Sequence, residues 1–83
     1  MIYLVHGDFK ILQVLEKDRK IPKRKFPILI KDRSLQTIYN SIRSLICLGI
    51  IKESLEKETY GYEKYIEPTK NGHELLNLLS RFG

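Results

Sequence analysis

The sequence predicts an α+β fold that is mainly helical, with three helices, a β hairpin and a C-terminal helix. One observation is the stretch 35–48, which is strongly amphipathic at helical spacing. A second is a pair of strand-like stretches at 50–55 and 62–67, and a third is a leucine-rich stretch at 70–81. A chain of 83 residues has room for one core, so we expect a single domain over residues 1–83.

The chain begins with a short apolar stretch followed by a helical pattern. Residues 2–6 could form a short strand, and Gly7 then breaks it. Asp8 is a good N-cap for the helix that we expect over residues 9–19. Ile11, Leu12 and Leu15 supply the inward stripe of that helix.

Two prolines divide the next segment. Pro22 ends the first helical pattern, so residues 20–26 are expected to form a basic connector. Pro27 suits the first turn of a helix, and residues 27–32 are therefore predicted to form a short second helix.

The third predicted helix, residues 35–48, gives the strongest signal. Ser34 is a good N-cap for it, and Gly49 ends it as glycine does after a helix. At 100° per residue one side of the helix is apolar and is predicted to face the core: Leu35, Ile38, Ile42, Leu45 and Ile46. The opposite side is polar and carries no acid: Gln36, Thr37, Asn40, Arg43, Ser44 and Cys47. A short helix, a tight turn and a capped helix predict a helix-turn-helix over about 27–48.

A hairpin and a last helix complete the pattern. The hairpin, or wing, is expected over about 50–67, with residues 57–61 as its loop and Gly61 as a turn residue. Thr69 is a good N-cap for a C-terminal helix over about 70–81. The helical pattern comes from Leu75, Leu76, Leu78, Leu79 and Phe82. The four leucines form a broader apolar band than one small core needs, which favours a dimer surface; the alternative is that all four fill the core of the monomer.

Positive charge is concentrated in the N-terminal half. The net charge is +5, and residues 1–48 carry ten Lys and Arg against four Asp and Glu. The excess lies mainly in one stretch: Arg19, Lys20, Lys23, Arg24, Lys25, Lys31 and Arg33. Such a distribution suits a polyanionic partner, although a basic surface that serves solubility alone is an open alternative.

Two motifs resemble those of a known family. Residues 45–51 resemble the "L-x-x-x-G-L-I" join between recognition helix and wing in winged-helix regulators of the MarR, ArsR and PadR type. Residues 65–76 are similar to their "Y-x-L-T-x-x-G-x-x-L-L" exit from the wing, in which Gly72 lets the last helix pack closely. The resemblance covers roughly residues 9–80. It implies a winged helix-turn-helix fold and a homodimeric transcription regulator.

Three features depart from the family pattern. Pro68 stands where the family usually has leucine before the threonine. The wing is acidic, whereas family wings often touch DNA with a basic tip; its acids are Glu53, Glu56, Glu58, Glu63 and Glu67, against Lys52, Lys57 and Lys64. The larger members dimerise through extra terminal helices that this sequence lacks, so we expect a dimer through residues 2–5 or the last helix.

The resemblance and the polar face together predict which residues contact double-stranded DNA. Base edges in the major groove would be read by Gln36, Thr37, Asn40 and Arg43. Phosphate contacts are predicted for Lys23, Arg24, Lys25, Lys31, Arg33, Ser34, Tyr39, Lys57 and Lys64. For the first set the alternative is an ordinary solvated helix face, and Tyr39 is equally suited to packing.

Other classes of function find little support. We expect no enzyme, because His6 and His73 stand in different elements and the carboxylates show no catalytic grouping. The single Cys47 predicts neither a disulfide nor, with two histidines, a structural zinc site, and we expect no cofactor and no small-molecule substrate. Cys47 as a redox sensor is an alternative whose only activator would be Arg43. No signal peptide or membrane span is evident, so we expect a soluble, cytoplasmic protein with no membrane partner.

Two other binding functions remain open. A protein-interaction module would use the acidic wing and its tyrosines, Tyr60, Tyr62 and Tyr65. A DNA-coating protein would bind duplex without base preference and with the same salt dependence.

Overall fold

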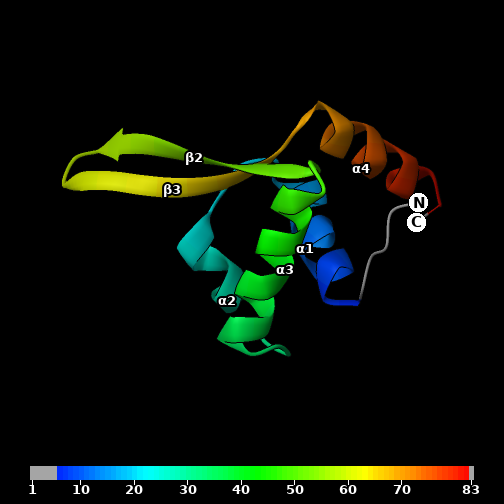
Figure 1. Ribbon diagram of the computed structural model, residues 1–83, viewed down its shortest axis with the longest axis horizontal. Helices are drawn as coiled ribbons and strands as arrows, with labels where there is room; N and C mark the ends of the chain where they lie inside the picture. Colours follow the sequence, from blue (N-terminus) through cyan, green and yellow to red (C-terminus); the bar gives the residue numbers. More distant parts are fainter. Residues whose placement is uncertain (1–5, 83) are drawn as a thin grey trace.

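The computed structural model describes residues 6–82 and shows a helical body from which a long hairpin projects (Figure 1). The elements in chain order are α1 (His6–Lys17), β1 (Ile21–Pro22), the 3₁₀ turn η1 (Lys23–Lys25), α2 (Phe26–Leu29), α3 (Leu35–Cys47), β2 (Ile51–Glu58), β3 (Gly61–Pro68) and α4 (Lys70–Phe82). The hairpin of β2 and β3 extends along the longest dimension of a molecule measuring 40 × 27 × 22 Å, and α4 lies at the opposite end. Within residues 6–82 no helix has the length and apolar content of a membrane span.

One hydrophobic core joins the three helices of the body to the root of the hairpin. It contains these buried side chains: Ile11, Leu12, Leu15, Ile21, Phe26, Ile30, Ile38, Ile42, Leu45, Ile50, Ile51, Ile66 and Leu76. Every described element except η1 contributes to this set, and burial of such side chains is worth about 1.5–3 kcal/mol each. The core therefore fixes α3 against α1 and the wing root, which is what a recognition surface requires.

Helix α1 starts earlier than predicted and ends earlier. It begins at His6, so Asp8 lies inside the first turn and is not the N-cap that we expected. A carboxylate in the first turn is still favourable, because the N-terminal end of a helix carries partial positive charge. The helix ends at Lys17 rather than at Arg19. The expected strand over residues 2–6 lies outside the described residues, except for His6, which is helical.

The expected connector contains structure that its composition does not predict. Ile21 and Pro22 form the short edge strand β1, which pairs antiparallel with β3 through Ile21↔Ile66 and Pro22↔Tyr65. Proline is acceptable there because an edge strand leaves N–H positions unpaired. The resulting sheet has the order β1-β3-β2. A two-residue strand has no periodicity to detect, and its existence depends on β3.

The second helix is shorter than predicted. Helix α2 begins at Phe26, one residue before the expected start, and ends at Leu29 rather than at residue 32. It stops because Ile30 leaves the helical conformation, with φ −111° and ψ 88°, while its N–H still reaches the Phe26 carbonyl at 2.8 Å. Ile30 is buried, so packing into the core directs this departure.

Helix α3 confirms the predicted caps but buries a narrower face. Gly49 follows the helix with φ +76°, a conformation that glycine adopts without strain. Leu35 and Ile46, expected in the core, are 53% and 37% exposed. At 100° per residue they lie roughly 60–80° round the helix from buried Ile38, at the edge of the face.

The wing is longer and its turn tighter than expected. Lys57 and Glu58, predicted to lie in the loop, pair with Tyr62 and Gly61 in the β2–β3 ladder. Only two residues remain as the turn, Thr59 and Tyr60, and Gly61 follows with φ +113°. Cross-strand pairing thus continues past the point where local composition changes, and it makes the wing a long two-stranded arm.

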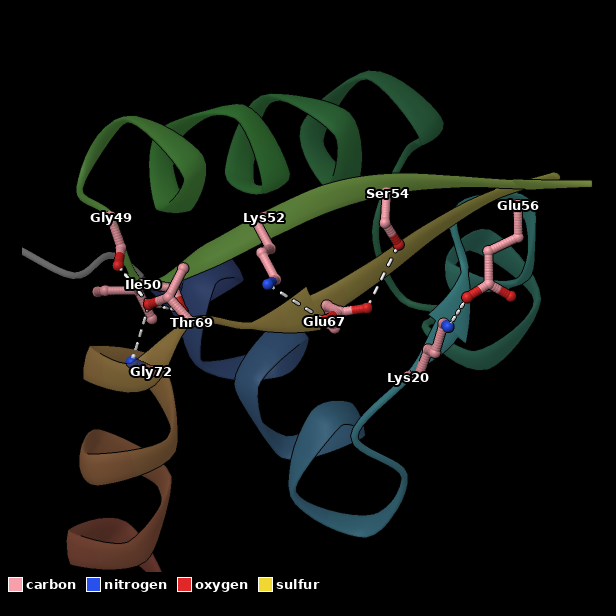
Figure 2. A network of polar contacts seen from close by, with 9 residues as sticks. All are labelled: Lys20, Gly49, Ile50, Lys52, Ser54, Glu56, Glu67, Thr69 and Gly72. Atoms are coloured by element: carbon pink, nitrogen blue, oxygen red, sulfur yellow. Dashed lines mark hydrogen bonds and ion pairs between the residues drawn. The ribbon is translucent and has the colours of Figure 1, made fainter. Parts of the chain in front are cut away.

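The wing root is joined to α4 by a compact set of hydrogen bonds, which Figure 2 shows. The single proton of the Thr69 hydroxyl is shared between the carbonyls of Gly49 at 2.5 Å and Ile50 at 3.1 Å, and the hydroxyl oxygen accepts from the Gly72 N–H at 3.2 Å. This confirms Thr69 as the cap of α4. A Cβ on Gly72 would lie 1.9 Å from the Ile50 carbonyl oxygen, so only glycine fits this close approach.

Candidate nucleic-acid interface

The predicted base-reading residues share one exposed face of α3, which we call the reading face: Gln36, Thr37, Asn40 and Arg43. The core holds the other side of the helix through Ile38, Ile42 and Leu45. The reading face therefore stands free of the body, and its side chains offer amide, hydroxyl and guanidinium groups. It carries no acid that would repel a phosphate.

The N-terminal turn of α3 is held by its cap. The Ser34 hydroxyl accepts from the Thr37 N–H at 3.2 Å and donates to the Thr37 hydroxyl oxygen at 2.8 Å. Each hydroxyl still has capacity for another partner, because the Thr37 proton and one Ser34 lone pair remain uncommitted in these two bonds. The cap thus orients Thr37 without removing it from the reading face.

The cations near the turn and those near the wing lie in different environments. Lys25, Lys31 and Arg33 flank α2 and the turn, and within residues 6–82 they make no ion pair. Arg43, on the reading face, is likewise free of ion pairs in this part of the chain. These four cations keep their full charge for an external anion.

Lys23 and Arg24 instead contact the wing. The Lys23 ammonium lies 3.0 Å from a Glu53 carboxylate oxygen and 5.5 Å from the centre of the Tyr39 ring. The Arg24 Nε donates to Glu63 at 2.5 Å. Tyr39 itself is half-buried and packs against the core, so it serves packing whatever else it contacts.

Each of the five wing carboxylates has a partner. Glu53 also lies 3.8 Å from Lys64, Glu56 pairs with Lys20, and Glu67 contacts Lys52 at 3.5 Å and the Ser54 hydroxyl at 3.3 Å. Figure 2 shows the pairs made by Glu56 and Glu67. Lys57, near the tip, makes no ion pair with any described residue. The acidity of the wing is therefore largely neutralised by the protein itself.

Glu58 is bound by a tyrosine rather than by a cation. The Tyr65 hydroxyl donates to its carboxylate at 2.7 Å. This hydrogen bond raises the pKa of Tyr65 above its ordinary value of 10.0, because loss of the proton would place two negative oxygens together.

A hollow of about 290 Å³ lies where η1, α3 and the wing meet, and we call it the wing hollow. Its lining residues are Lys23, Arg24, Tyr39, Tyr62, Glu63 and Lys64. Tyr39 precedes Asn40 on α3 and stands one helical turn from Gln36 and Arg43, so the hollow borders the reading face. The hollow brings together four of the residues predicted to contact phosphate, Lys23, Arg24, Tyr39 and Lys64.

A larger hollow, about 740 Å³, lies elsewhere, between α1 and α2. Its lining mixes apolar side chains such as Val14 and Leu29 with charged ones such as Lys17 and Asp32. No residue of α3 or of the wing lines it. Of the residues predicted to contact DNA, Lys25 alone lines this hollow.

Solved structures of similar shape exist. No protein-family model and no curated sequence matches the chain. A PadR family transcription regulator from Clostridium difficile superposes with a TM-score of 0.73 at 20% identity, over 93% of this chain and 85% of that one. A transcriptional regulator homologue from Pyrococcus horikoshii gives 0.72 at 23% identity, over 88% and 72%. A protein assigned to the MarR family of transcriptional regulators, from Porphyromonas gingivalis, gives 0.69 at 17% identity, over 87% and 70%.

The fold is a winged helix-turn-helix. The similar structures confirm the predicted fold class, α+β and mainly helical. They also confirm the predicted resemblance to winged-helix regulators of the PadR and MarR type. In this winged helix-turn-helix, α2 and α3 form the helix-turn-helix pair and β2 and β3 form the wing. Likeness at such identities shows the fold alone.

The sequence alone did not predict the ion pairs of the wing acids, including the one made by Lys20. Lys20 pairs with Glu56 and lies 5.2 Å from the Tyr65 ring centre. Only the β1–β3 pairing brings these residues together, and no local pattern signals it. Cys47 is an exposed, free thiol, and within residues 6–82 no group of His, Cys, Asp and Glu gathers that could hold a metal ion.

Proposed function

We propose that this chain is a sequence-specific, double-stranded DNA-binding transcription regulator. The observation that carries the proposal is the acid-free reading face of α3, exposed and bordered by cations that make no ion pair with the described residues. An α-helix of this size fits the major groove, where each base pair presents a distinct pattern of donors, acceptors and methyl groups. The regulators named among the structural neighbours support the same class of function.

The reading face suits particular bases. Gln36 and Asn40 carry amides that can make paired hydrogen bonds to adenine, and Arg43 can do the same to guanine. The Thr37 methyl suits contact with the thymine methyl group. Lys25, Lys31, Arg33 and Ser34 would bind phosphates and set the position of α3 without reading sequence, and Lys57 would add one contact from the wing.

We further propose a homodimer that acts as a repressor. A single reading face makes few contacts, and two copies on a symmetric site would double them. On α4, Leu78 is 50% exposed while Leu75 and Leu79 are half-buried, so an apolar strip remains at the surface. We propose α4 as the dimer surface, because a second copy would cover that strip.

One specific observation favours a second candidate, a protein-interaction module. At the wing tip Tyr60 and Tyr62 are 98% and 67% exposed, and Leu55 is 60% exposed. Exposed aromatic groups of this kind are typical of protein contacts. In that case the wing, rather than α3, would carry binding.

A pair of double variants separates the two candidates. The regulator proposal expects N40A/R43A to lose most binding to a duplex pool in fluorescence anisotropy, while L55A/Y60A, which changes exposed wing side chains outside the wing hollow, retains it. Both variants alter exposed side chains, so both should keep the far-UV circular dichroism of the parent. Duplex binding that survives N40A/R43A would contradict the proposal that α3 reads DNA. A non-specific binder would lose affinity with salt but would not distinguish one duplex from another.

A further inference from the structure

The cations of the wing hollow are already bound by wing carboxylates in the free protein. Glu53 on β2 stands between the ammonium groups of Lys23 and Lys64, at 3.0 and 3.8 Å. Glu63 on β3 accepts from Arg24. Thus every cation that lines the hollow faces a carboxylate from the same chain.

We propose that the wing hollow is the seat of a DNA backbone phosphate, and that Glu53 and Glu63 occupy its cations as an intramolecular competitor until DNA displaces them. This inference rests on the proposed function. A phosphate and a carboxylate are bound by the same groups, since both are oxyanions that accept from ammonium and guanidinium. The hollow also offers two phenol groups, Tyr39 and Tyr62, of a kind that often contacts phosphate oxygens.

The position of the hollow, between α3 and the wing, favours a DNA backbone phosphate as its ligand. It borders the reading face through Tyr39, so DNA held by α3 would place its backbone beside the wing. About 290 Å³ is ample for one phosphate group and its sugar oxygens. Three cations against the nearby Glu53 and Glu63 leave one positive charge before DNA arrives, and they leave three once the carboxylates move aside.

The contacts are weak enough to be exchanged. The Arg24 side chain is 71% exposed and the Lys64 side chain 60% exposed, and exposed ion pairs contribute little free energy. The Glu53 and Lys23 side chains are about one-third exposed, so that pair is the stronger part of the competitor. The consequence is a lower affinity for any short or poorly matched duplex, because each phosphate contact at the hollow must replace an existing one.

Removing the competitor while keeping its shape tests the proposal. E53Q and E63Q are compared with the parent and with E16Q, which removes the same charge from an exposed position of α1. The probe is a fluorescein-labelled 24-base-pair duplex of random sequence, titrated at several salt concentrations. We expect E53Q to tighten binding about 3- to 10-fold and to steepen the slope of log K against log salt by about 1. E16Q should shift affinity slightly and leave the slope unchanged.

A double-mutant cycle identifies the partner of Glu53. K23M should cost little in the parent, where Lys23 is occupied, and about 3- to 10-fold more in the E53Q background, where it is free for phosphate. Equal cost in the two backgrounds would overturn the proposal. So would weaker binding by E53Q, because Glu53 would then support the wing rather than compete with DNA.

The outcomes separate this proposal from the function on which it rests. Tight binding by all proteins, with E53Q and E63Q matching E16Q in affinity and slope, would refute the competitor and leave DNA binding intact. No binding by any protein at low salt would refute both. Thermal unfolding of each variant checks folding, and if E53Q unfolds early, E63Q carries the same test because its partner Arg24 is largely exposed.

Discussion

The cations beside the turn of the helix-turn-helix and those beneath the wing are chemically alike but differ in what they already bind. Lys25, Lys31 and Arg33 make no ion pair within residues 6–82, whereas Lys23 and Arg24 are held by wing carboxylates. The sequence places all five in one basic stretch. The charge available to a polyanion therefore depends on long-range pairing, and a count of basic residues overstates it.

The largest expected effect concerns the packing of α4 against the root of the wing. G72A should destabilise the fold by about 3 kcal/mol, because the added Cβ would overlap the Ile50 carbonyl and separate α4 from the wing root. Thermal or urea unfolding followed by circular dichroism measures this. The neighbouring exposed variant N71A serves as the control and should unfold like the parent. Equal stability of the two variants would mean that the wing root is loosely packed. The wing carboxylates would then not be held beside Lys23 and Arg24, and these cations would not differ from those beside the turn.

A second variant tests the reading face directly. R43A should weaken binding to a preferred duplex by about 1–3 kcal/mol, or roughly 5- to 150-fold, because it removes a contact with base edges or phosphate. K70A removes the same charge at the start of α4, away from the reading face, and should change affinity only slightly. If both variants weaken binding equally, the effect of Arg43 is one of net charge alone.

A third set of variants tests whether the cations beside the turn contribute more to duplex binding than the cations held by wing carboxylates. K31A and R33A should each weaken duplex binding about 3- to 10-fold and reduce the salt slope by about 0.9, since each removes one phosphate contact. K23A and R24A should cost less, because DNA must first displace Glu53 or Glu63 to reach these cations. Anisotropy titrations over a salt series measure both quantities. Indistinguishable losses and slopes across the four variants would contradict the distinction.

The smallest expected effect concerns the outer part of the wing. E58Q should lower the pKa of Tyr65 toward 10.0, because the carboxylate that accepts its proton is replaced by a neutral amide. The raised pKa means that the folded state favours the neutral phenol. This contribution is present below about pH 10 and is lost as the pH rises through the raised pKa. Ultraviolet absorbance of tyrosinate against pH, in the parent and in E58Q, measures the shift. A Tyr65 titration that E58Q leaves unchanged would show that the hydrogen bond is absent in solution.

Features encoded by local chemistry were predictable from the sequence. Ser34 and Gly49 delimit α3 because a hydroxyl cap and a positive φ are properties of single residues. Thr69 and Gly72 were similarly evident from the motif that they share with known winged-helix regulators. The winged helix-turn-helix fold followed from these points and from the periodicity of α3.

Features encoded by long-range pairing were not predictable in the same way. The strand β1 has two residues and forms only against β3. Its pairing in turn brings Lys20 to Glu56. The extent of the wing also depends on the strand register, which carries Lys57 into the ladder despite its loop-like neighbours. The candidate site is therefore predictable as a set of residue types on α3, but not as a charge distribution.

Selection from a random duplex pool with the purified protein at moderate salt tests the central claim most directly. The proposed function predicts enrichment of an inverted repeat whose half-sites lie one helical turn apart, as two symmetric reading faces would require. N40A/R43A should not enrich that sequence. Retention of DNA without enrichment, lost steeply as salt rises, would contradict sequence-specific reading. No retention even at low salt would contradict DNA binding altogether and direct attention to the exposed tyrosines of the wing.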